Sequence, residues 1–422
     1  MKRVIFVLLS GALVALFMLA MWQDTTREWT HPQQAFRNTL AKEERSGLHP
    51  GIHQMILADL NRVDRCTTCH VAIDKPQLAL AEEPFTAHPG RFLEWHPPER
   101  FGCTVCHGGQ GLATEVKAAH GDVPHWEEPL LRGSLVQASC YQCHGDLAPI
   151  AAYAPQLVRG KALFEAKGCY GCHTIKAFGH EFGGTISQDL SDIGAKPYEL
   201  IKADFEMLEE PHTRIHWLLR KLAHPRALNP GSRPEELPPG EEEVFPSAMP
   251  HFGLAPDEAE AITTYLLSLR GLDLPSSYVR PPKEAPQPVY ASVVERGRAM
   301  FEKFGCNGCH GAGGAGGRRN WNAGLGQEVP SLLYVKAYYG NRIDALKDLI
   351  RDGRQPAPRA DPTRPFPSLY MPSWKGRIPE GDLDALTAYL FSLHDQLPAQ
   401  PAMVSGAAQA AASDAPPEAP AP

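Results

Sequence analysis

The sequence predicts a mainly α-helical protein with much irregular structure, and three observations lead to this prediction. All ten cysteines fall in five copies of Cys-x-x-Cys-His. An uncharged apolar run covers residues 4–22, close to the N-terminus. The chain also holds 40 prolines and 37 glycines, which is many for a globular fold. We therefore expect an N-terminal transmembrane helix, followed by short helices and turns built around the repeated motif.

The Cys-x-x-Cys-His motif is the attachment signature of c-type haem. Its two thiols add to the two vinyl groups of one haem, and the adjacent histidine ligates the iron. A disulfide framework or a zinc site would leave the trailing histidine without a role. We expect five covalently bound haem c groups, attached through Cys66, Cys69, Cys103, Cys106, Cys140, Cys143, Cys169, Cys172, Cys306 and Cys309. The proximal iron ligands are expected to be His70, His107, His144, His173 and His310.

Residues 1–23 are the first predicted element, a membrane anchor or signal. The apolar run is long enough to cross a bilayer as a helix. Small residues at a cleavage site are poorly represented, which favours an uncleaved anchor over a cleaved signal peptide. Lys2 and Arg3 place the N-terminus in the cytoplasm. Because haem of this type is attached outside the cytoplasmic membrane, we expect a single-pass protein with its haem domains on the periplasmic side.

The first three motifs form one predicted module. Their first cysteines, at positions 66, 103 and 140, are 37 residues apart in both intervals (103 − 66 and 140 − 103). This spacing is too short for each haem to have its own folded domain. Residues 59–154 are therefore predicted to be a haem-packed triheme module, joined to the membrane by a connector over residues 24–58 with one or two helices.

The last two motifs lie in two units of similar sequence. Residues 159–169 resemble residues 296–306, and residues 261–269 match residues 385–393 at six of nine positions. Apolar residues of the closing segments recur at helical spacing, and acidic residues precede them, as suits a helix N-terminus. An internal duplication explains this similarity at both ends of the unit. We place the first unit at residues 155–271 and the second unit at residues 292–396.

Three further segments are rich in proline or alanine. Residues 272–291 are predicted to be an extended and fairly stiff linker, and residues 397–422 a disordered Ala/Pro tail. Residues 196–243 are a charged, proline-containing insert in the first unit. We expect this insert to be a solvated excursion rather than a docking surface.

The sixth ligand of each iron sets its reduction potential and decides whether the iron is open to substrates. Met249 and Met371 each precede a proline at equivalent places in the two units, so we expect them to be the sixth ligands there. His251 remains a rival to Met249. The three irons of the triheme module have four candidate loop ligands, which the sequence does not pair with individual haems: His88, His96, His120 and His125. His49 and His53 lie upstream as reserves.

The two units resemble class I cytochrome c domains, which consist of a helix, the haem motif, a Met-Pro ligand loop and a C-terminal helix that crosses the first. The N-terminal module resembles triheme modules of cytochromes that accompany bacterial quinol-oxidising cytochrome bc-type complexes. The segments that carry this second resemblance are Asp64-Arg-Cys-Thr-Thr-Cys-His, Phe101-Gly-Cys-Thr-Val-Cys-His-Gly-Gly-Gln-Gly and His125-Trp-Glu-Glu-Pro.

These observations predict a membrane-anchored electron carrier of the respiratory chain with no catalytic activity of its own. The resemblance implies a quinol-oxidising cytochrome bc-type membrane complex as donor, and a soluble cytochrome or terminal reductase as acceptor. Because methionine ligation raises the potential, electrons should run from the triheme module to the two distal domains. The alternative is a multihaem peroxidase or nitrogen-oxide reductase, which needs one open iron. The formal charge of −7 gives no sign of nucleic-acid binding.

Overall fold

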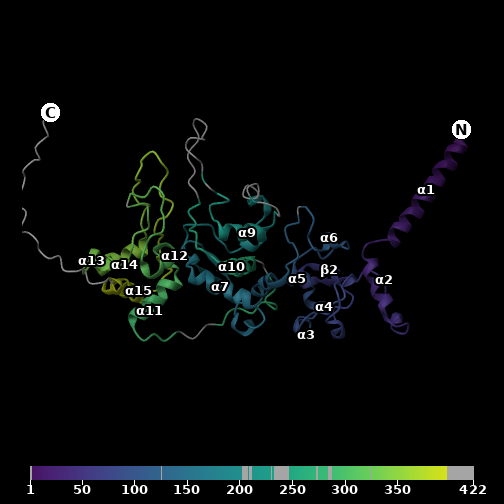
Figure 1. The fold of residues 1–422 in the computed structure, drawn as a ribbon, viewed down its shortest axis with the longest axis horizontal. Helices are drawn as coiled ribbons and strands as arrows, with labels where there is room; N and C mark the ends of the chain where they lie inside the picture. Colours follow the sequence, from purple (N-terminus) through teal and green to yellow (C-terminus); the bar gives the residue numbers. More distant parts are fainter. Residues whose placement is uncertain are drawn as a thin grey trace, which may run out of the picture.

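The computed structural model describes residues 2–124, 126–201, 208, 212–229, 231, 247–271, 274–283, 288–324 and 326–396. These segments follow one another along one long axis in chain order (Figure 1). Four predictions fall wholly or partly outside the described residues: the ligand role of His125, parts of the insert, parts of the linker and the C-terminal tail.

Helix α1 (Lys2–Thr25) stands at one end of the molecule (Figure 1). Among the described residues it is the one helix that is long and apolar enough to cross a membrane, and none of its apolar window is buried against the rest of the chain. A membrane anchor and a signal sequence both have these properties. The position of the predicted helix is therefore confirmed.

The connector is fixed to the first motif by helix α2 (Thr30–Thr39). The Gln33 side chain is only 4% exposed, and its Nε2 donates to the carbonyl oxygens of Gly51 at 2.6 Å and Thr68 at 2.9 Å. The Gly51 amide donates back to Gln33 Oε1 at 3.0 Å. Because Thr68 lies between the two cysteines of the first motif, this glutamine joins helix α2 to that motif.

The region of the first three motifs, residues 59–154, has little regular structure, and its buried apolar side chains beyond residue 130 belong to the core of the first unit. Among the described residues 58–130, only Ala72 and Ala87 are buried apolar side chains. Its short elements, with those that lead into it, are η1 (Glu44–Gly47), β1 (Met55–Leu57), η2 (Ala58–Leu60), β2 (Arg62–Asp64), η3 (Cys66–Thr68), η4 (Pro76–Leu78), α3 (Phe92–Trp95), α4 (Pro98–Phe101), α5 (Thr104–His107), α6 (Val116–Ala119), η5 (Gly133–Gln142) and η6 (Ala148–Ile150). A chain this poor in apolar core needs another apolar filler, as embedded porphyrins would supply.

Two antiparallel hairpins were not foreseen from the sequence. Strands β1 and β2 pair from Met55 with Asp64 to Leu57 with Arg62, so the ordered region begins before the predicted boundary at residue 59. In the first unit, β3 (Ile175–Ala177) pairs with β4 (His180–Phe182). Each strand has only three residues, which is too short for an alternating pattern to stand out.

Both units are built on a pair of crossed helices, as predicted. Helix α7 (Pro155–Ala166) crosses α10 (Pro256–Ser268), and α11 (Val293–Lys303) crosses α15 (Glu380–Ser392). A Cβ atom at Gly160 would collide with the carbonyl of Ala261. The remaining described elements of the units are η7 (Cys169–Gly171), η8 (Ile193–Ala195), η9 (Tyr198–Leu200), α9 (Arg214–Ala223), α12 (Cys306–His310), η11 (Ala312–Gly314), α13 (Val335–Tyr339), α14 (Ile343–Asp352) and η12 (Leu393–Gln396).

Both helix crossings have a glycine where the two helices approach most closely, which supports a duplicated unit. A Cβ at Gly297 would collide with the carbonyl of Ala385, as one at Gly160 would with its partner in the first unit. Only glycine allows the two helix backbones to approach so closely. The acidic residues predicted for the helix N-termini lie in the first turns of α10 and α15, where they face the positive end of the helix dipole.

The described part of the insert was predicted wrongly as a solvated excursion. Helix α9 packs against α10, and Trp217, Leu218 and Leu222 are buried in the core of the first unit. Its apolar positions 215, 218, 219 and 222 follow helical periodicity. The periodicity of these positions therefore indicates a helix, but the many charged residues and prolines of the insert favoured the prediction of an exposed segment.

Arg214, at the start of α9, ties the first unit to the three-motif region. Its side chain is 6% exposed, and its guanidinium lies 3.2 Å from Glu128 and 3.5 Å from Glu127. We expect Arg214→Ala to destabilise the protein by about 1–3 kcal/mol, because it leaves the two partly buried carboxylates without this cation. Calorimetric unfolding of the haem-loaded protein measures the change. Lys161→Ala, which removes an exposed pair with Glu165, should cost less than about 0.5 kcal/mol. Equal losses in the two variants would contradict the structural role of Arg214.

Candidate haem-binding sites

Each of the five motifs folds as one tight helical turn. In the first four, the histidine amide donates to the carbonyl oxygen of the first cysteine at 3.0, 3.0, 2.9 and 3.1 Å. The fifth motif coincides with helix α12. Residues three and four apart share one face of a helical turn. Both thiols and the imidazole of each motif are therefore on the same side, as attachment to one porphyrin requires.

The structure places a different loop histidine opposite each of the first three motif histidines. The ring centroids are 6.5 Å apart for His70 and His120, 6.1 Å for His107 and His88, and 6.2 Å for His144 and His96. An iron ligated by an imidazole on each side would hold the centroids about 6 Å apart, because each metal–nitrogen bond is about 2 Å and each nitrogen lies about 1 Å from its ring centre. The three spacings fit such a metal. His125, the fourth candidate, lies outside the described residues.

The motif histidines of the two units are oriented by carbonyl groups. His173 Nδ1 lies 2.8 Å from the Gln188 oxygen, and His310 Nδ1 lies 3.3 Å from the Pro330 oxygen. A proton held on Nδ1 leaves Nε2 free to bind a metal, which is the predicted orientation. Burial lowers the pKa of both imidazoles and so favours the neutral form that ligates metals.

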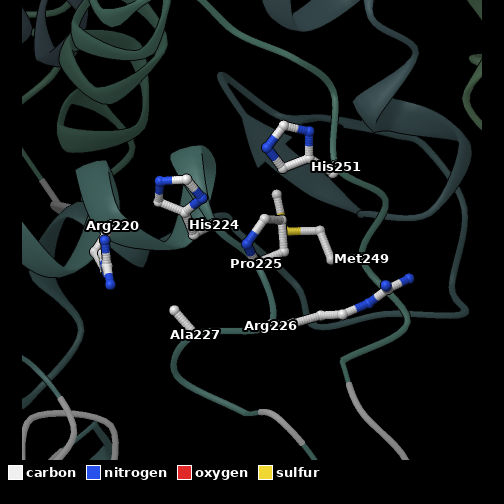
Figure 2. Close-up of a pocket in the computed structure, with 7 residues that line it drawn as sticks. All are labelled: Arg220, His224, Pro225, Arg226, Ala227, Met249 and His251. Atoms are coloured by element: carbon white, nitrogen blue, oxygen red, sulfur yellow. The ribbon is translucent and has the colours of Figure 1, made fainter.

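A cavity of about 580 Å³ opens beside Met249 in the first unit (Figure 2). Figure 2 shows Met249, His224 and His251 gathered around it, with Arg220 and Arg226 at its rim. The thioether is a soft ligand suited to haem iron, and the guanidinium groups are suited to the carboxylates of a haem. The lining therefore fits a haem that meets Met249 on one face.

His251, the rival ligand, is less well disposed than Met249. Its Nδ1 accepts a hydrogen bond from the Gly253 amide at 3.3 Å. In a neutral imidazole this arrangement places the proton on Nε2 and removes the lone pair that would bind iron. The contact thus favours the methionine.

Met371 takes the corresponding place in the second unit. It packs against the core of that unit, and its carbonyl accepts the Arg354 amide at 2.8 Å. Two buried donors of the same unit, Arg318 Nε and Trp321 Nε1, find no hydrogen-bond partner within the described part of the chain. Buried donors are rarely left unsatisfied. Carboxylate groups of a haem would suit both.

The first three motifs contact one another in chain order. Asp64, fully buried just before the first motif, accepts the amides of Cys103 at 2.8 Å and Thr104 at 3.2 Å in the second motif. The hydroxyl of Ser139, just before the third motif, donates to the Cys106 carbonyl at 2.6 Å. The roles of these two residues could not be predicted from the sequence, because their partners lie 33 to 40 positions away.

Three buried tyrosines connect the third motif to the fourth. Tyr141 lies between the cysteines of the third motif, and its ring centroid is 5.9 Å from that of Tyr265 on α10. The Tyr265 hydroxyl is 3.0 Å from the hydroxyl of Tyr170, which lies between the cysteines of the fourth motif. Burial raises the pKa of Tyr141 to about 12, so its phenol stays neutral. The tyrosine that follows the first cysteine of both motifs is the sequence feature from which this contact could have been predicted.

The fourth and fifth motifs touch directly. Cys172 Sγ lies 3.5 Å from Cys309 Sγ, and Asn307 Nδ2 donates to the Ala166 carbonyl at 2.9 Å. Arg377 of the second unit also pairs with Glu181 of the first at 3.1 Å. Each of the five motifs is therefore linked to the next by a direct contact or by adjoining buried side chains.

Comparison with known families agrees with this architecture. Residues 157–270 match the family model for cytochrome c, and residues 292–390 match the model for subunit III of cbb3-type cytochrome c oxidase. No curated protein and no solved structure matches the chain. Cytochrome c domains carry covalently bound haem c and transfer electrons. The chain is a c-type cytochrome, an electron-transfer haem protein with two cytochrome c domains.

Proposed function

We propose that this cytochrome is a membrane-anchored pentahaem conduit. It takes electrons from a quinol-oxidising cytochrome bc-type membrane complex and delivers them to a soluble cytochrome or terminal reductase. The observation that carries the proposal is the continuity of the five motifs, which follow one another in space from the end near α1 to the second cytochrome c domain. Helix α1 then serves as the single-pass anchor, with the haem domains on the periplasmic side.

The axial ligands give the conduit its direction. In the proposal, His70 pairs with His120, His107 with His88, and His144 with His96; His173 pairs with Met249, and His310 with Met371. Bound haem supplies one-electron redox chemistry at each iron. The protein orients each iron through these side chains and excludes water from it. Because methionine ligation raises the potential, the two distal domains attract electrons from the triheme module.

A spectroelectrochemical titration of the full-length protein tests this direction. We expect three haems to titrate as a low-potential group and two as a high-potential pair, in line with their ligands. Mass measurement of the mature chain should first show five added haems. A high-potential group of three, or fewer than five haems, would contradict the proposal.

A further inference from the structure

The second variable position of the haem motif separates the five motifs into two groups. The first three motifs have Thr68, Val105 and Gln142 there, whereas the fourth and fifth have Gly171 and Gly308. Neither glycine has a positive φ angle. Any residue adopts such a backbone. Conformational freedom therefore does not explain these two glycines, in contrast to the left-handed Gly168 and Gly305 that precede the same motifs.

The explanation is the close approach of the two cytochrome c domains. A Cβ at Gly171 would collide with the carbonyl of Gly305, and a Cβ at Gly308 would collide with the carbonyl of Gly168. The contact is reciprocal, because the glycine inside each motif rests on the glycine that precedes the other motif. A side chain at either site would push the two backbones apart. The Cys172 and Cys309 sulfurs lie 3.5 Å apart within this contact.

We propose that Gly171 and Gly308 are positioning residues that hold the haems of the two cytochrome c domains edge to edge, so that these domains exchange electrons as one coupled pair. Cys172 and Cys309 each form one thioether bond to their own haem. Sulfurs in van der Waals contact therefore bring the two porphyrin edges together. Each domain takes up one electron, which reduces its ferric iron to ferrous, and passes one electron on. The inference rests on the proposed function only for the source of these electrons.

Circular dichroism of the Soret band tests the pairing independently of activity. Two haems in edge contact couple their transitions and give a bisignate band, which isolated haems do not. We expect this band in the difference spectrum between the oxidised full-length protein and the protein poised so that only the high-potential pair is reduced. We expect Gly171→Val and Gly308→Val to abolish it while all five haems remain attached. Gly381→Val is the matched control, because a Cβ there meets only Arg296 at 3.6 Å.

Each outcome decides the question. A bisignate band that survives in both valine variants overturns the role of the glycines. Its absence from the unaltered protein overturns the edge-to-edge pair, even where the valine variants fail to fold. A titration that lacks the low-potential group refutes the proposed conduit, and the pair is then judged from the oxidised spectra: a bisignate band that the unaltered protein has and the valine variants lack supports the pair, and its absence from the unaltered protein overturns it.

Discussion

Replacing Met371 by histidine should lower the reduction potential of the haem in the second cytochrome c domain by on the order of 0.1 V or more. Thioether ligation favours the ferrous iron, and axial ligands together tune haem potentials over about 0.8 V. For a one-electron couple, each 59 mV changes the equilibrium tenfold, so a 0.1 V shift redistributes electrons by about 50-fold. Electrons should then collect on the first domain. Spectroelectrochemistry measures the shift, and a decrease of the sulfur-to-iron absorption band, by the share of the second domain, reports the exchanged ligand.

Met300 provides the control for this change. It is a buried core methionine on α11 in the same domain. Met300→Leu nearly conserves volume, and it should leave both the potential and the sulfur band in place. Because the Met249 haem should still give this band, a band that keeps its full intensity in Met371→His would show that another side chain ligates the second iron. In the first domain the same comparison separates the two candidate ligands: Met249→Leu should remove the first domain's share of the band, and His251→Leu should leave the band at full intensity.

The sequence predicted the features that local signals determine. Each closing helix has an apolar stripe at helical spacing and acidic residues in its first turn, and both α10 and α15 lie where these signals place them. The repeated glycine of the first helix follows from the same duplication. The five motifs specify their own local geometry, because a tight turn with two cysteines and a histidine is encoded within five residues.

The contacts between distant segments could not be predicted in this way. His120 faces His70 across 50 residues of sequence, and the intervening chain has no regular pattern that would determine its path. The reciprocal glycine contact could not be predicted from the sequence either, because a glycine within the motif does not by itself indicate a neighbouring backbone. The missed α9 is different in kind. Its apolar residues recur at helical spacing, but the charged and proline-containing flanks favoured the prediction of an exposed loop. The burial of the apolar face depends on packing within the first domain, which the sequence does not show.

If the first three motifs bind haem as proposed, removing a loop histidine should open one of their irons. In His120→Ala we expect the iron bound to His70 to lose its sixth ligand, to become high-spin and to bind one carbon monoxide, whereas the unaltered protein should bind none. His88→Ala and His96→Ala should each open a different iron. His53→Ala is the control, since the His53 imidazole already contacts the His49 carbonyl at 2.9 Å and faces no motif histidine in the structure. Optical spectra with and without carbon monoxide measure all four variants.

The triple variant His88→Ala, His96→Ala and His120→Ala decides whether the three pairs act independently. Three separate irons should give three carbon monoxide molecules bound per protein, because each histidine faces a different motif. Binding of only two, together with carbon monoxide binding to His125→Ala, would show that His125 ligates one iron and that one ring pair is mere packing. Binding to the unaltered protein would instead favour the alternative, an enzyme with an open haem. The same titration therefore tests the ligand pairs and separates a conduit from a catalyst.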